Sequence, residues 1–346
     1  MKKIYRKAAA GIAAAFLILG NMPHSWALSA HSAIVIDAVT GRVLYEKNAD
    51  QRSLIASTTK IMTGLLICEN CEMEDPVTIS QEAVGIEGSS LNLQAGEQIT
   101  VEELLYGMML CSGNDAAAAL AIHCSGNFST FVSQMNERAA SLGLKRTKFS
   151  NPHGLDEKDH YSTARELAYL TAAAMENTVF REVVSTRQIT FGDRVYTNHN
   201  KLLWQYEGAL GVKTGYTKAA GRVLVSCAQR NGRRLIAVTI NAPDDWQDHK
   251  SMLDQGFSAY QVSYTLELDQ SRISVPDMHA AGKPVCFSMD EDWTVSAMAE
   301  ETISFRFVVP FSMNCYQIPA QVFLLIDGKI ADSRPLNCQR NMMEES

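Results

Sequence analysis

The sequence predicts an α+β fold in which strands from both ends of one domain form a sheet covered by a helical middle, followed by a small all-β domain. Strand-like runs occupy residues 32–47 and 221–241, and helical periodicity fills the region between them. That periodicity stops near Thr265, where alternating strand patterns begin. A chain of 346 residues is long enough for two such domains. We therefore expect the domains to span residues 31–264 and 265–346.

Residues 1–30 have the composition of a secretory signal peptide. Residues 1–7 are basic, residues 8–19 are apolar but short for a bilayer span, and small residues follow at 25–30. The pattern predicts cleavage after Ala27 or Ala30, and hence a secreted, extracytoplasmic protein. Cleavage removes four Lys and Arg residues, which lowers the formal net charge from −7 to about −11. An acidic surface argues against nucleic acid as a partner.

Two strand-like runs open the mature chain, and helices follow them. Residues 32–37 and 42–47 flank a predicted hairpin turn, and a helical run starts at Ser57. Thr100 and Glu103 match a capping box, in which each side chain satisfies a free backbone N–H at the start of a helix. After an interruption at residues 111–114, further helices are predicted at residues 116–123, 128–142 and 163–177.

Strand-like runs return in the last third of the chain. Residues 221–229 and 233–241 are separated by Asn231-Gly232, the strongest short hairpin signal. A last helix at residues 252–260 is expected to pack on the resulting sheet. In the C-terminal domain the alternating runs are residues 301–309, 321–326 and 329–332.

The eight cysteines would permit disulfides in an exported protein. Cys68 and Cys71 form a single C-x-x-C with no second pair and no nearby histidine, which argues against zinc. Most of the others lie in apolar runs that are typical of small core residues. Spacing alone does not determine which cysteines pair.

Ser57 and Lys60 are the first candidates for chemistry. Three residues apart at the start of a helix, they lie on one face, and the helix N-terminus favours negative charge near Ser57. Burial among apolar residues would lower the pKa of Lys60, and a neutral amine can take a proton from serine. By itself the pair is better explained as a capping serine and a snorkelling lysine.

Two further stretches supply matching groups. Ser112-Gly113-Asn114 breaks a helical region in the way needed to present a hydroxyl and an amide to a cleft. Lys213-Thr214-Gly215 leads into the strand-like run from Gly221, where Gly215 would let a substrate approach the backbone closely. Lys213 and Thr214 offer a charge and a hydroxyl to an anionic group. Taken singly, each stretch is better explained as an ordinary helix junction or strand edge.

Together, S-x-x-K, S-x-N and K-T-G form a known catalytic set. On these motifs the chain resembles the active-site serine penicillin-recognising enzymes, and among them the low-molecular-mass penicillin-binding proteins, which are D-alanyl-D-alanine carboxypeptidases. The resemblance covers residues 32–260, and the β-rich tail looks more loosely like the C-terminal domain of many members. It implies a β-lactamase/transpeptidase-like catalytic domain. The stretches that carry it are ASTTKIMT at 56–63, LCSGNDA at 110–116, NPHGL at 151–155 and VKTGYT at 212–217.

The resemblance implies the following catalytic roles. Ser57 would be the nucleophile and Lys60, as a neutral amine, the base that activates it. Ser112 would relay the proton to the leaving amine, and Asn114 would hold the substrate's amide. Each role depends on the matching family motif in this chain.

It also implies how the substrate is held. Lys213, as a cation, and Thr214 would bind the terminal carboxylate beside Gly215. The backbone N–H groups of Ser57 and Tyr216 would form the oxyanion hole. No cofactor and no metal ion is expected.

The implied activity is serine-type D-Ala-D-Ala carboxypeptidase action on peptidoglycan pentapeptide stems, through an acyl-enzyme on Ser57. β-Lactam antibiotics would act as covalent inhibitors. Two alternatives stay open: a D,D-endopeptidase that cuts cross-links with the same residues, and a β-lactam-binding or β-lactam-sensing protein with little turnover. Peripheral membrane association is a further alternative, although residues 337–346 lack the length and apolar face of the family's membrane-binding helix.

Other catalytic classes fit less well. The chain contains no G-x-S-x-G elbow of a Ser-His-Asp hydrolase and no E-x-x-L-N loop of a class A β-lactamase. His153 and His199 are interpreted as loop-shaping residues. The loop with Asp156, Asp159 and His160 is interpreted as solvated surface, not as a metal site. Cys111, where relatives often have proline, marks a departure from the family pattern.

Overall fold

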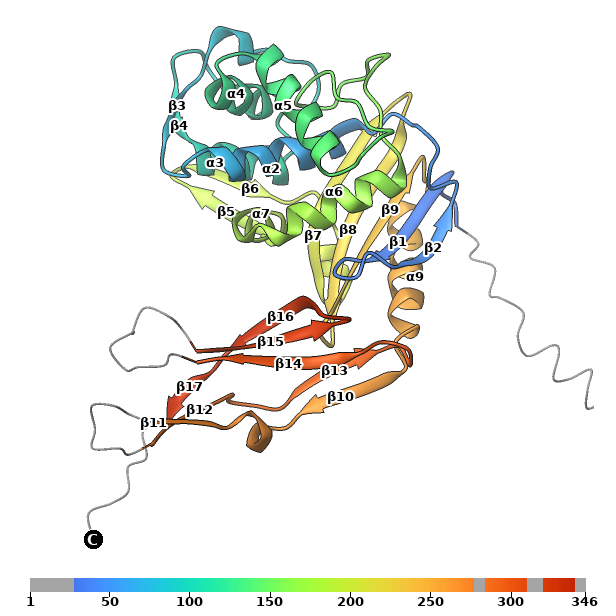
Figure 1. Cartoon of the computed structure of the whole chain (residues 1–346). Helices are drawn as coiled ribbons and strands as arrows, with labels where there is room; N and C mark the ends of the chain where they lie inside the picture. Colours follow the sequence, from blue (N-terminus) through green and yellow to red (C-terminus); the bar gives the residue numbers. More distant parts are fainter. Residues whose placement is uncertain (1–27, 277–283, 310–319, 340–346) are drawn as a thin grey trace, which may run out of the picture.

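The computed structural model describes residues 28–276, 284–309 and 320–339. The larger part of the molecule is a five-stranded antiparallel sheet with the strand order β2-β1-β9-β8-β7. Helices lie on both faces of this sheet, and the C-terminal strands form a second body beside it (Figure 1). The sheet strands are β1 (Ser32–Asp37), β2 (Val43–Lys47), β7 (Ala209–Thr217), β8 (Gly221–Arg230) and β9 (Arg233–Ile240).

Both faces of the sheet are buried, because alternate side chains of each strand enter different cores. Ile34 and Ile36 of β1 join the core beneath the helical layer, whereas Ala33 and Val35 enter the core beneath the last helix. β9 lies in the middle of the sheet, and all of its residues are buried. The two predicted hairpins, β1–β2 and β8–β9, are confirmed.

One face of the sheet carries most of the helices, and α9 covers the other face (Figure 1). The helices are α2 (Lys60–Asn70), α3 (Val101–Leu110), α4 (Asn114–Ser125), α5 (Phe128–Ser141), α6 (Ala164–Glu176), α7 (Thr178–Ser185), α8 (Leu202–Gln205) and α9 (Asp245–Ser258). Short 3₁₀ segments are η1 (Ala56–Thr59), η2 (Gln81–Ala83) and η3 (Leu268–Ser271). Small hairpins are formed by β3 (Pro76–Thr78) with β4 (Gln98–Thr100) and by β5 (Gln188–Phe191) with β6 (Arg194–Thr197).

Helix starts follow the capping chemistry of the sequence. The Thr100 hydroxyl accepts a hydrogen bond of 3.2 Å from the Glu103 N–H, which confirms the predicted start of α3. The helices predicted at residues 128–142 and 163–177 are confirmed as α5 and α6. The last helix, α9, begins at Asp245, earlier than predicted. Its first turns are mostly polar, so the spacing of apolar residues that predicts a helix is not evident there. None of the described helices combines the length and apolar character needed to cross a membrane.

The first described residues are part of this fold. Asp248 of α9 accepts hydrogen bonds from the Ser29 hydroxyl at 2.7 Å and from the Ser29 and Ala30 N–H groups at 3.0 Å each. Lys47 donates to the Ala30 carbonyl at 2.7 Å. Residues 1–27 of the predicted signal peptide lie outside the described residues.

The C-terminal strands form three small antiparallel sheets, ordered β10-β13, β11-β12-β17 and β14-β15-β16. The predicted hairpin across Asp327-Gly328 is confirmed as β15–β16. The boundary predicted at residues 264/265 falls inside β10, which pairs with β13, so we place the boundary between α9 and β10. The strands are β10 (Val262–Leu266), β11 (Ile273–Pro276), β12 (Pro284–Ser288), β13 (Trp293–Ala297), β14 (Ile303–Val308), β15 (Gln321–Ile326), β16 (Lys329–Pro335) and β17 (Asn337–Gln339).

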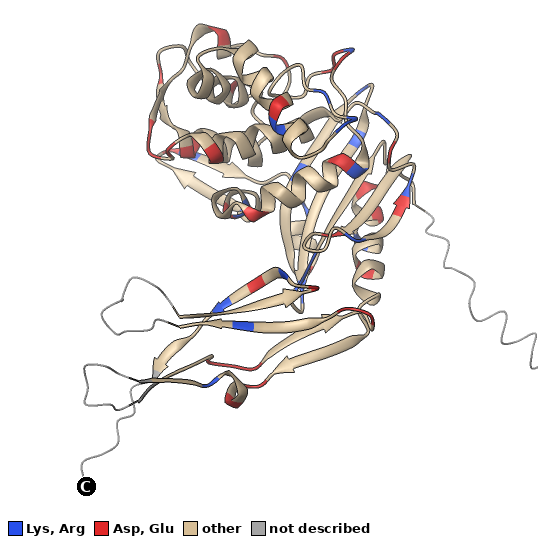
Figure 2. Ribbon diagram, viewed as in Figure 1, with Lys and Arg blue, Asp and Glu red and all other residues tan. Residues whose placement is uncertain are grey.

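A buried ionic cluster joins the two bodies. Arg233, at the start of β9, bonds to Asp37 of β1 at 3.4 Å, to Glu301 from the C-terminal body, and to the Ser296 carbonyl at 2.6 Å. All three charged side chains are almost fully buried, and the Tyr260 hydroxyl donates to Asp37 at 2.7 Å. Acidic and basic residues meet at this junction (Figure 2). The arginine therefore connects the sheet to the C-terminal strands through charge-assisted hydrogen bonds.

We expect Arg233→Ala to lower the free energy of unfolding by about 3–5 kcal/mol, because Asp37 and Glu301 would stay buried without their cation. Arg138→Ala is the matched control, since Arg138 pairs with Glu69 on the surface and should cost about 1 kcal/mol or less. Urea-induced unfolding followed by circular dichroism measures both. Equal losses of unfolding free energy in the two variants would show that the buried cluster stabilises the fold no more than a surface ion pair does.

Candidate active site

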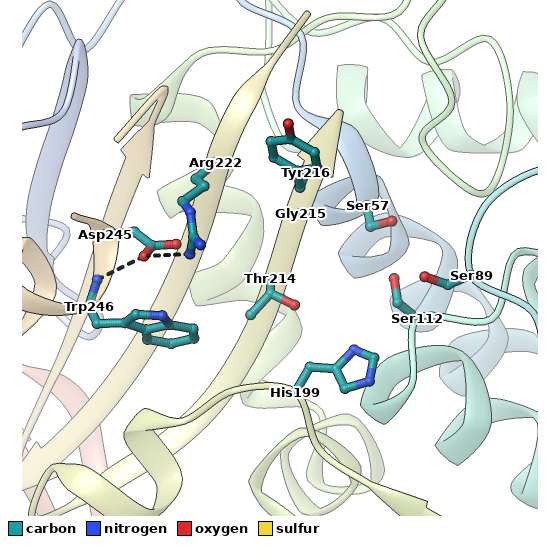
Figure 3. A pocket seen from close by; sticks show the side chains of 10 residues that line it. All are labelled: Ser57, Ser89, Ser112, His199, Thr214, Gly215, Tyr216, Arg222, Asp245 and Trp246. Atoms are coloured by element: carbon teal, nitrogen blue, oxygen red, sulfur yellow. Dashed lines mark hydrogen bonds and ion pairs between the residues drawn. The ribbon is translucent and has the colours of Figure 1, made fainter. Parts of the chain in front are cut away.

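Five of the eight sequence-predicted residues line a cleft of about 520 Å³ between the helical layer and β7, the edge strand of the sheet, whereas Lys60, Asn114 and Lys213 are buried and do not line it. Figure 3 shows Ser57, Ser89 and Ser112 gathered on the helical side, with Thr214 reaching toward them from β7. The cleft is lined by Ser57, Ser89, Ser112, His199, Thr214, Gly215, Tyr216, Arg222, Asp245 and Trp246.

Ser57 lies on the 3₁₀ turn η1, immediately before α2. Ala56 precedes it in the left-handed region with φ 47°, a strained conformation for a residue with a side chain. Two close approaches hold the turn: a Cβ on Gly154 would lie 2.0 Å from the Ala56 carbonyl oxygen, and one on Gly215 would lie 3.1 Å from the Ser57 nitrogen. Gly215 thus allows β7 to pack closely against η1, a reason that the sequence did not reveal.

Lys60 begins α2 and its side chain is 0% exposed. Its Nζ lies 3.0 Å from Ser57 Oγ, 2.6 Å from Asn114 Oδ1 and 2.6 Å from the His153 carbonyl oxygen. The predicted Ser57–Lys60 neighbourhood is present, and a backbone carbonyl completes it.

The burial of Lys60 and the charge near it favour a neutral amine. Burial lowers the pKa of Lys60 well below its usual value, the nearby charge of Lys213 lowers it further, and Asp115 partly opposes both. A neutral amine has two N–H donors and one lone pair. The oxygens of Asn114 and His153 can only accept, so they use both donors and leave the lone pair directed at the Ser57 hydroxyl.

The Asn-Pro-His-Gly stretch forms the wall behind Lys60. The Pro152 carbonyl accepts a hydrogen bond of 2.6 Å from the Thr63 hydroxyl, and the Asn151 side chain accepts one of 2.7 Å from the Gly154 N–H. The backbone of His153 binds Lys60, while burial lowers the pKa of its imidazole to about 3. The interpretation of His153 as a loop-shaping residue agrees with these contacts.

His160 was expected on a solvated loop, and this expectation was wrong, because the side chain is 1% exposed beneath η1. Its Nδ1 accepts from the Ser150 N–H at 3.0 Å, so Nε2 carries the proton and donates to the Thr59 hydroxyl at 2.6 Å. That hydroxyl donates in turn to the Ala56 carbonyl at 2.8 Å. His160 thereby supports the turn that carries Ser57.

Ser112 lies in the break between α3 and α4 that the sequence predicted, and Asn114 is the first residue of α4. Ser112 lines the cleft and adopts φ 65°, a second strained conformation at the site. Asn114 has both ends of its amide occupied, since Oδ1 accepts from Lys60 and Nδ2 donates to the Glu87 carbonyl at 2.5 Å. In this structure Asn114 positions Lys60, and its role in holding a substrate amide stays a prediction.

Asp115 is a site residue that the sequence reasoning missed. Its carboxylate is buried at the N-terminus of α4, where it accepts from the Ser90 hydroxyl at 2.6 Å and the Leu91 N–H at 2.9 Å. The Asn114 N–H donates to the Ser89 carbonyl at 2.7 Å. Together these bonds fasten the loop with Ser89 over the cleft. Asp115 directly follows the S-x-N motif, which is the signal that could have drawn attention to it.

Lys213 and Thr214 lie on β7, where Lys213 is buried and Thr214 lines the cleft. Burial lowers the pKa of Lys213 to about 7, and its Nζ donates to the Thr214 carbonyl at 3.0 Å. Lys213 was expected to be a cation. With this lowered pKa, the side chain is fully charged at neutral pH only when an anionic ligand lies beside it. Tyr216 follows Gly215 at the rim, with 67% of its surface exposed.

The far end of the cleft holds groups that the sequence reasoning did not select. Arg222 of β8 bonds to Asp245 of α9 at 3.3 Å, and Trp246 lies beside them (Figure 3). His199 also lines the cleft, so the interpretation of it as only a loop residue was incomplete; burial lowers the pKa of its imidazole. These residues come from strands and helices that only the fold brings together.

Metal ligands do not form part of this arrangement. In residues 28–276, 284–309 and 320–339, no three His, Cys, Asp or Glu side chains are grouped so that they could hold a metal ion. The groups described above are amines, hydroxyls and backbone amides. They can transfer protons and bind an anion.

The family model described as D-alanyl-D-alanine carboxypeptidase matches residues 20–244 of the chain. The chain belongs to this family. D-alanyl-D-alanine carboxypeptidase DacF of Bacillus subtilis (strain 168) is 39% identical over 256 residues, which cover 70% of this chain and 66% of that protein. D-alanyl-D-alanine carboxypeptidase DacC of Escherichia coli (strain K12) is 30% identical over 342 residues, which cover 92% and 85%.

Solved structures give the same assignment. Penicillin binding protein 5 from Haemophilus influenzae matches with a TM-score of 0.67 at 28% identity, covering 92% of this chain and 98% of that one. A mutant of the streptomyces K15 DD-transpeptidase matches with a TM-score of 0.64 at 34% identity, covering 67% and 98%. The predicted family and fold class, including the small all-β sheets, are confirmed.

We expect the rate of acylation by penicillin to be bell-shaped in pH. Acid protonates Lys60 and removes the base, whereas base neutralises Lys213 near pH 7 and weakens carboxylate binding. The second-order rate of labelling by a fluorescent penicillin, measured from pH 4 to 11, tests this. Lys213→Arg, whose guanidinium keeps its charge, should move the alkaline limb upward. A rate that rises steadily toward pH 10.5 would show that Lys60 titrates normally, against the mechanism.

Proposed function

We propose that this protein is a serine-type D-Ala-D-Ala carboxypeptidase that removes the terminal D-alanine from peptidoglycan pentapeptide stems. The observation that carries the proposal is the buried amine of Lys60, 3.0 Å from Ser57 Oγ and with two carbonyl acceptors. Membership of the D-alanyl-D-alanine carboxypeptidase family supports the same substrate class. The chain matches just under two thirds of the length of the Bacillus subtilis relative, so the activity is offered here as a proposal.

Acylation begins with proton transfer from the Ser57 hydroxyl to Lys60 Nζ. Ser57 Oγ then attacks the carbonyl carbon of the penultimate D-alanine. As the tetrahedral intermediate collapses, the C–N bond breaks, and the proton reaches the leaving amine through Ser112. Free D-alanine departs and an ester on Ser57 remains. Water, deprotonated by Lys60, hydrolyses this ester and regenerates the enzyme.

The oxyanion of this intermediate is assigned to the backbone N–H groups of Ser57 and Tyr216. The close approach of Gly215 to the Ser57 nitrogen supports this placement, because it brings the two segments side by side. Such preorganised donors are each worth roughly 3–4 kcal/mol of the barrier. Their position depends on the strained turn at Ala56.

The substrate would lie along β7. As an edge strand, β7 is paired on one side only, with β8, so an extended peptide can add to its free side. Its terminal carboxylate would then meet Thr214 and Lys213, with Arg222 further along the cleft. A bound carboxylate raises the pKa of Lys213 and restores the cation that burial disfavours.

We further propose that the protein works in the cell envelope after cleavage following Ala27. Ser29 and Ala30 bind Asp248 of α9, and cleavage after Ala30 would remove these contacts. β-Lactams would acylate Ser57 because they present a strained amide next to a carboxylate. Attachment to a membrane stays an open part of this proposal.

We expect Ser57→Ala to lose covalent labelling by penicillin, since the acylated oxygen is absent, and to release no D-alanine from pentapeptide. Intact-mass spectrometry of the exported wild-type protein should show one penicillin adduct and a chain beginning at Leu28. Thr58→Ser is a control, because it keeps the hydroxyl that bonds to the Ile55 carbonyl and leaves Ser57 intact. Retained labelling of Ser57→Ala would overturn the proposal.

Products distinguish the related activities. Free D-alanine from monomeric pentapeptide indicates a carboxypeptidase, and monomers released from cross-linked dimers indicate an endopeptidase. A single acylation without turnover indicates a sensor.

We expect Arg222→Ala to raise KM for a D-Ala-D-Ala peptide by about tenfold with little change in kcat, because it removes a cation at the carboxylate end of the cleft. A substrate with an amidated C-terminus should respond little to the change. Arg230→Ala is the matched control, since Arg230 is on the same strand but pairs with Asp254. Equal KM values for wild type and Arg222→Ala would remove Arg222 from the binding site.

A further inference from the structure

Three cysteines lie together at the end of α2 and α4 that is remote from the cleft. Cys71 is the C-cap of α2, Cys68 stands one turn earlier, and Cys124 is in the last turn of α4. The thiols of Cys71 and Cys124 are close enough to share a side-chain hydrogen bond. All three side chains are partly exposed while packed against the main core.

The same two helices carry the active-site groups at their other ends. Lys60 begins α2 and Asn114 begins α4, where their side chains are bonded at 2.6 Å. The two helices pack against each other, and β3, which follows Cys71, also lies against α4. The helix pair is therefore held at the cleft by a hydrogen bond and at the opposite end by the two thiols.

We propose that Cys71 and Cys124 form a disulfide bond that fastens α2 to α4, with Cys68 left as a free thiol. Thiols near enough to share a hydrogen bond can approach to the disulfide bond length of about 2.05 Å by side-chain rotation. The bond would close a loop of about 50 residues that contains β3, β4 and α3, so it would restrict the unfolded chain strongly. The proposal uses the envelope location suggested above, where disulfides persist, and does not depend on the reaction.

The chemistry is a thiol–disulfide exchange with a low-molecular-mass disulfide or a disulfide-bonded oxidoreductase as the oxidant. The Cys124 thiolate attacks one sulfur of the oxidant's disulfide and forms a mixed disulfide with it, while the oxidant's S–S bond breaks and its other sulfur leaves as a thiol. The Cys71 sulfur, after losing its proton, attacks Cys124 and releases the second thiol. The two cysteines lose two electrons and two protons, and the oxidant gains them.

The surroundings favour this order of attack. The hydrogen bond from Cys71 lowers the pKa of Cys124 to about 7, so Cys124 is the readier thiolate. The same contact raises the pKa of Cys71, and burial raises that of Cys68 to about 12. Cys68 is therefore not a ready thiolate either, and Cys124 is the one expected to attack first.

The linkage can be read directly by mass spectrometry. The chain has no Lys or Arg between Lys60 and Arg138, so trypsin leaves these cysteines in one peptide. Glu-C in phosphate buffer cuts after Glu and Asp and separates them. After oxidation with oxidised glutathione and blocking of free thiols, we expect the fragment 70–72, with Cys71, joined to the fragment 116–137, with Cys124.

Thermal unfolding gives the second measurement. We expect oxidised wild-type protein to melt on the order of 10 °C above the protein reduced with dithiothreitol. Cys124→Ser should lose both the cross-linked fragment and this difference, whereas the matched control Cys68→Ser should keep both. Penicillin labelling at 25 °C should stay within about twofold in all forms, which shows that each variant is folded.

Two results would overturn the proposal. One is oxidised wild-type protein without the 71–124 link, and the other is a link through Cys68 in its place. Failure of penicillin labelling in wild type would count against the proposed function and leave the disulfide result to be read from the peptides alone.

Discussion

The site depends on one constraint, which is that the Lys60 amine is buried with oxygen acceptors but without a carboxylate partner. Asn114 Oδ1 and the His153 carbonyl satisfy its N–H groups, and neither contributes a full negative charge. Burial therefore disfavours the ammonium form, and the lone pair is left for Ser57. The helix junction before Asn114 and the Asn-Pro-His-Gly loop matter because they deliver those two oxygens.

Three buried cationic side chains in this molecule show how their partners decide their function. Arg233 lies between the carboxylates of Asp37 and Glu301 and joins two parts of the chain. Lys60 contacts two carbonyl oxygens and the Ser57 hydroxyl, none of them a carboxylate, and can be neutral. Lys213 is intermediate, since burial lowers its pKa to about 7 and an anionic ligand can restore its charge. The ion pairs of Arg233, and the proton transfer and anion binding proposed for the two lysines, thus depend on the same physical cost of burying charge.

Strained backbone and buried amines lower the stability of the fold at the proposed catalytic site. Ala56 and Ser112 both adopt positive φ, and the two lysines give up hydration. The compensation comes from the sheet, whose strands are buried on both faces, and from His160, which holds the Ser57 turn from below. A rigid scaffold of this type is needed because a neutral base must meet its serine at hydrogen-bond distance.

Much of this could be predicted from local sequence. Asn231-Gly232 identified the β8–β9 hairpin, Thr100 identified the start of α3, and the three short motifs indicated the correct family. These features were predictable because turn chemistry, helix caps and motif spacing each act within a few residues.

Long-range features were not predictable in this way. The burial of His160, the anchoring by Asp115 and the approach of Arg222 and Asp245 to the cleft arise from segments far apart in the chain. So does the packing reason for Gly215, which was assigned to substrate access. The sequence by itself determined which groups could do chemistry. Only the tertiary structure decided their protonation and their partners, because burial and charge depend on neighbours that no local pattern specifies.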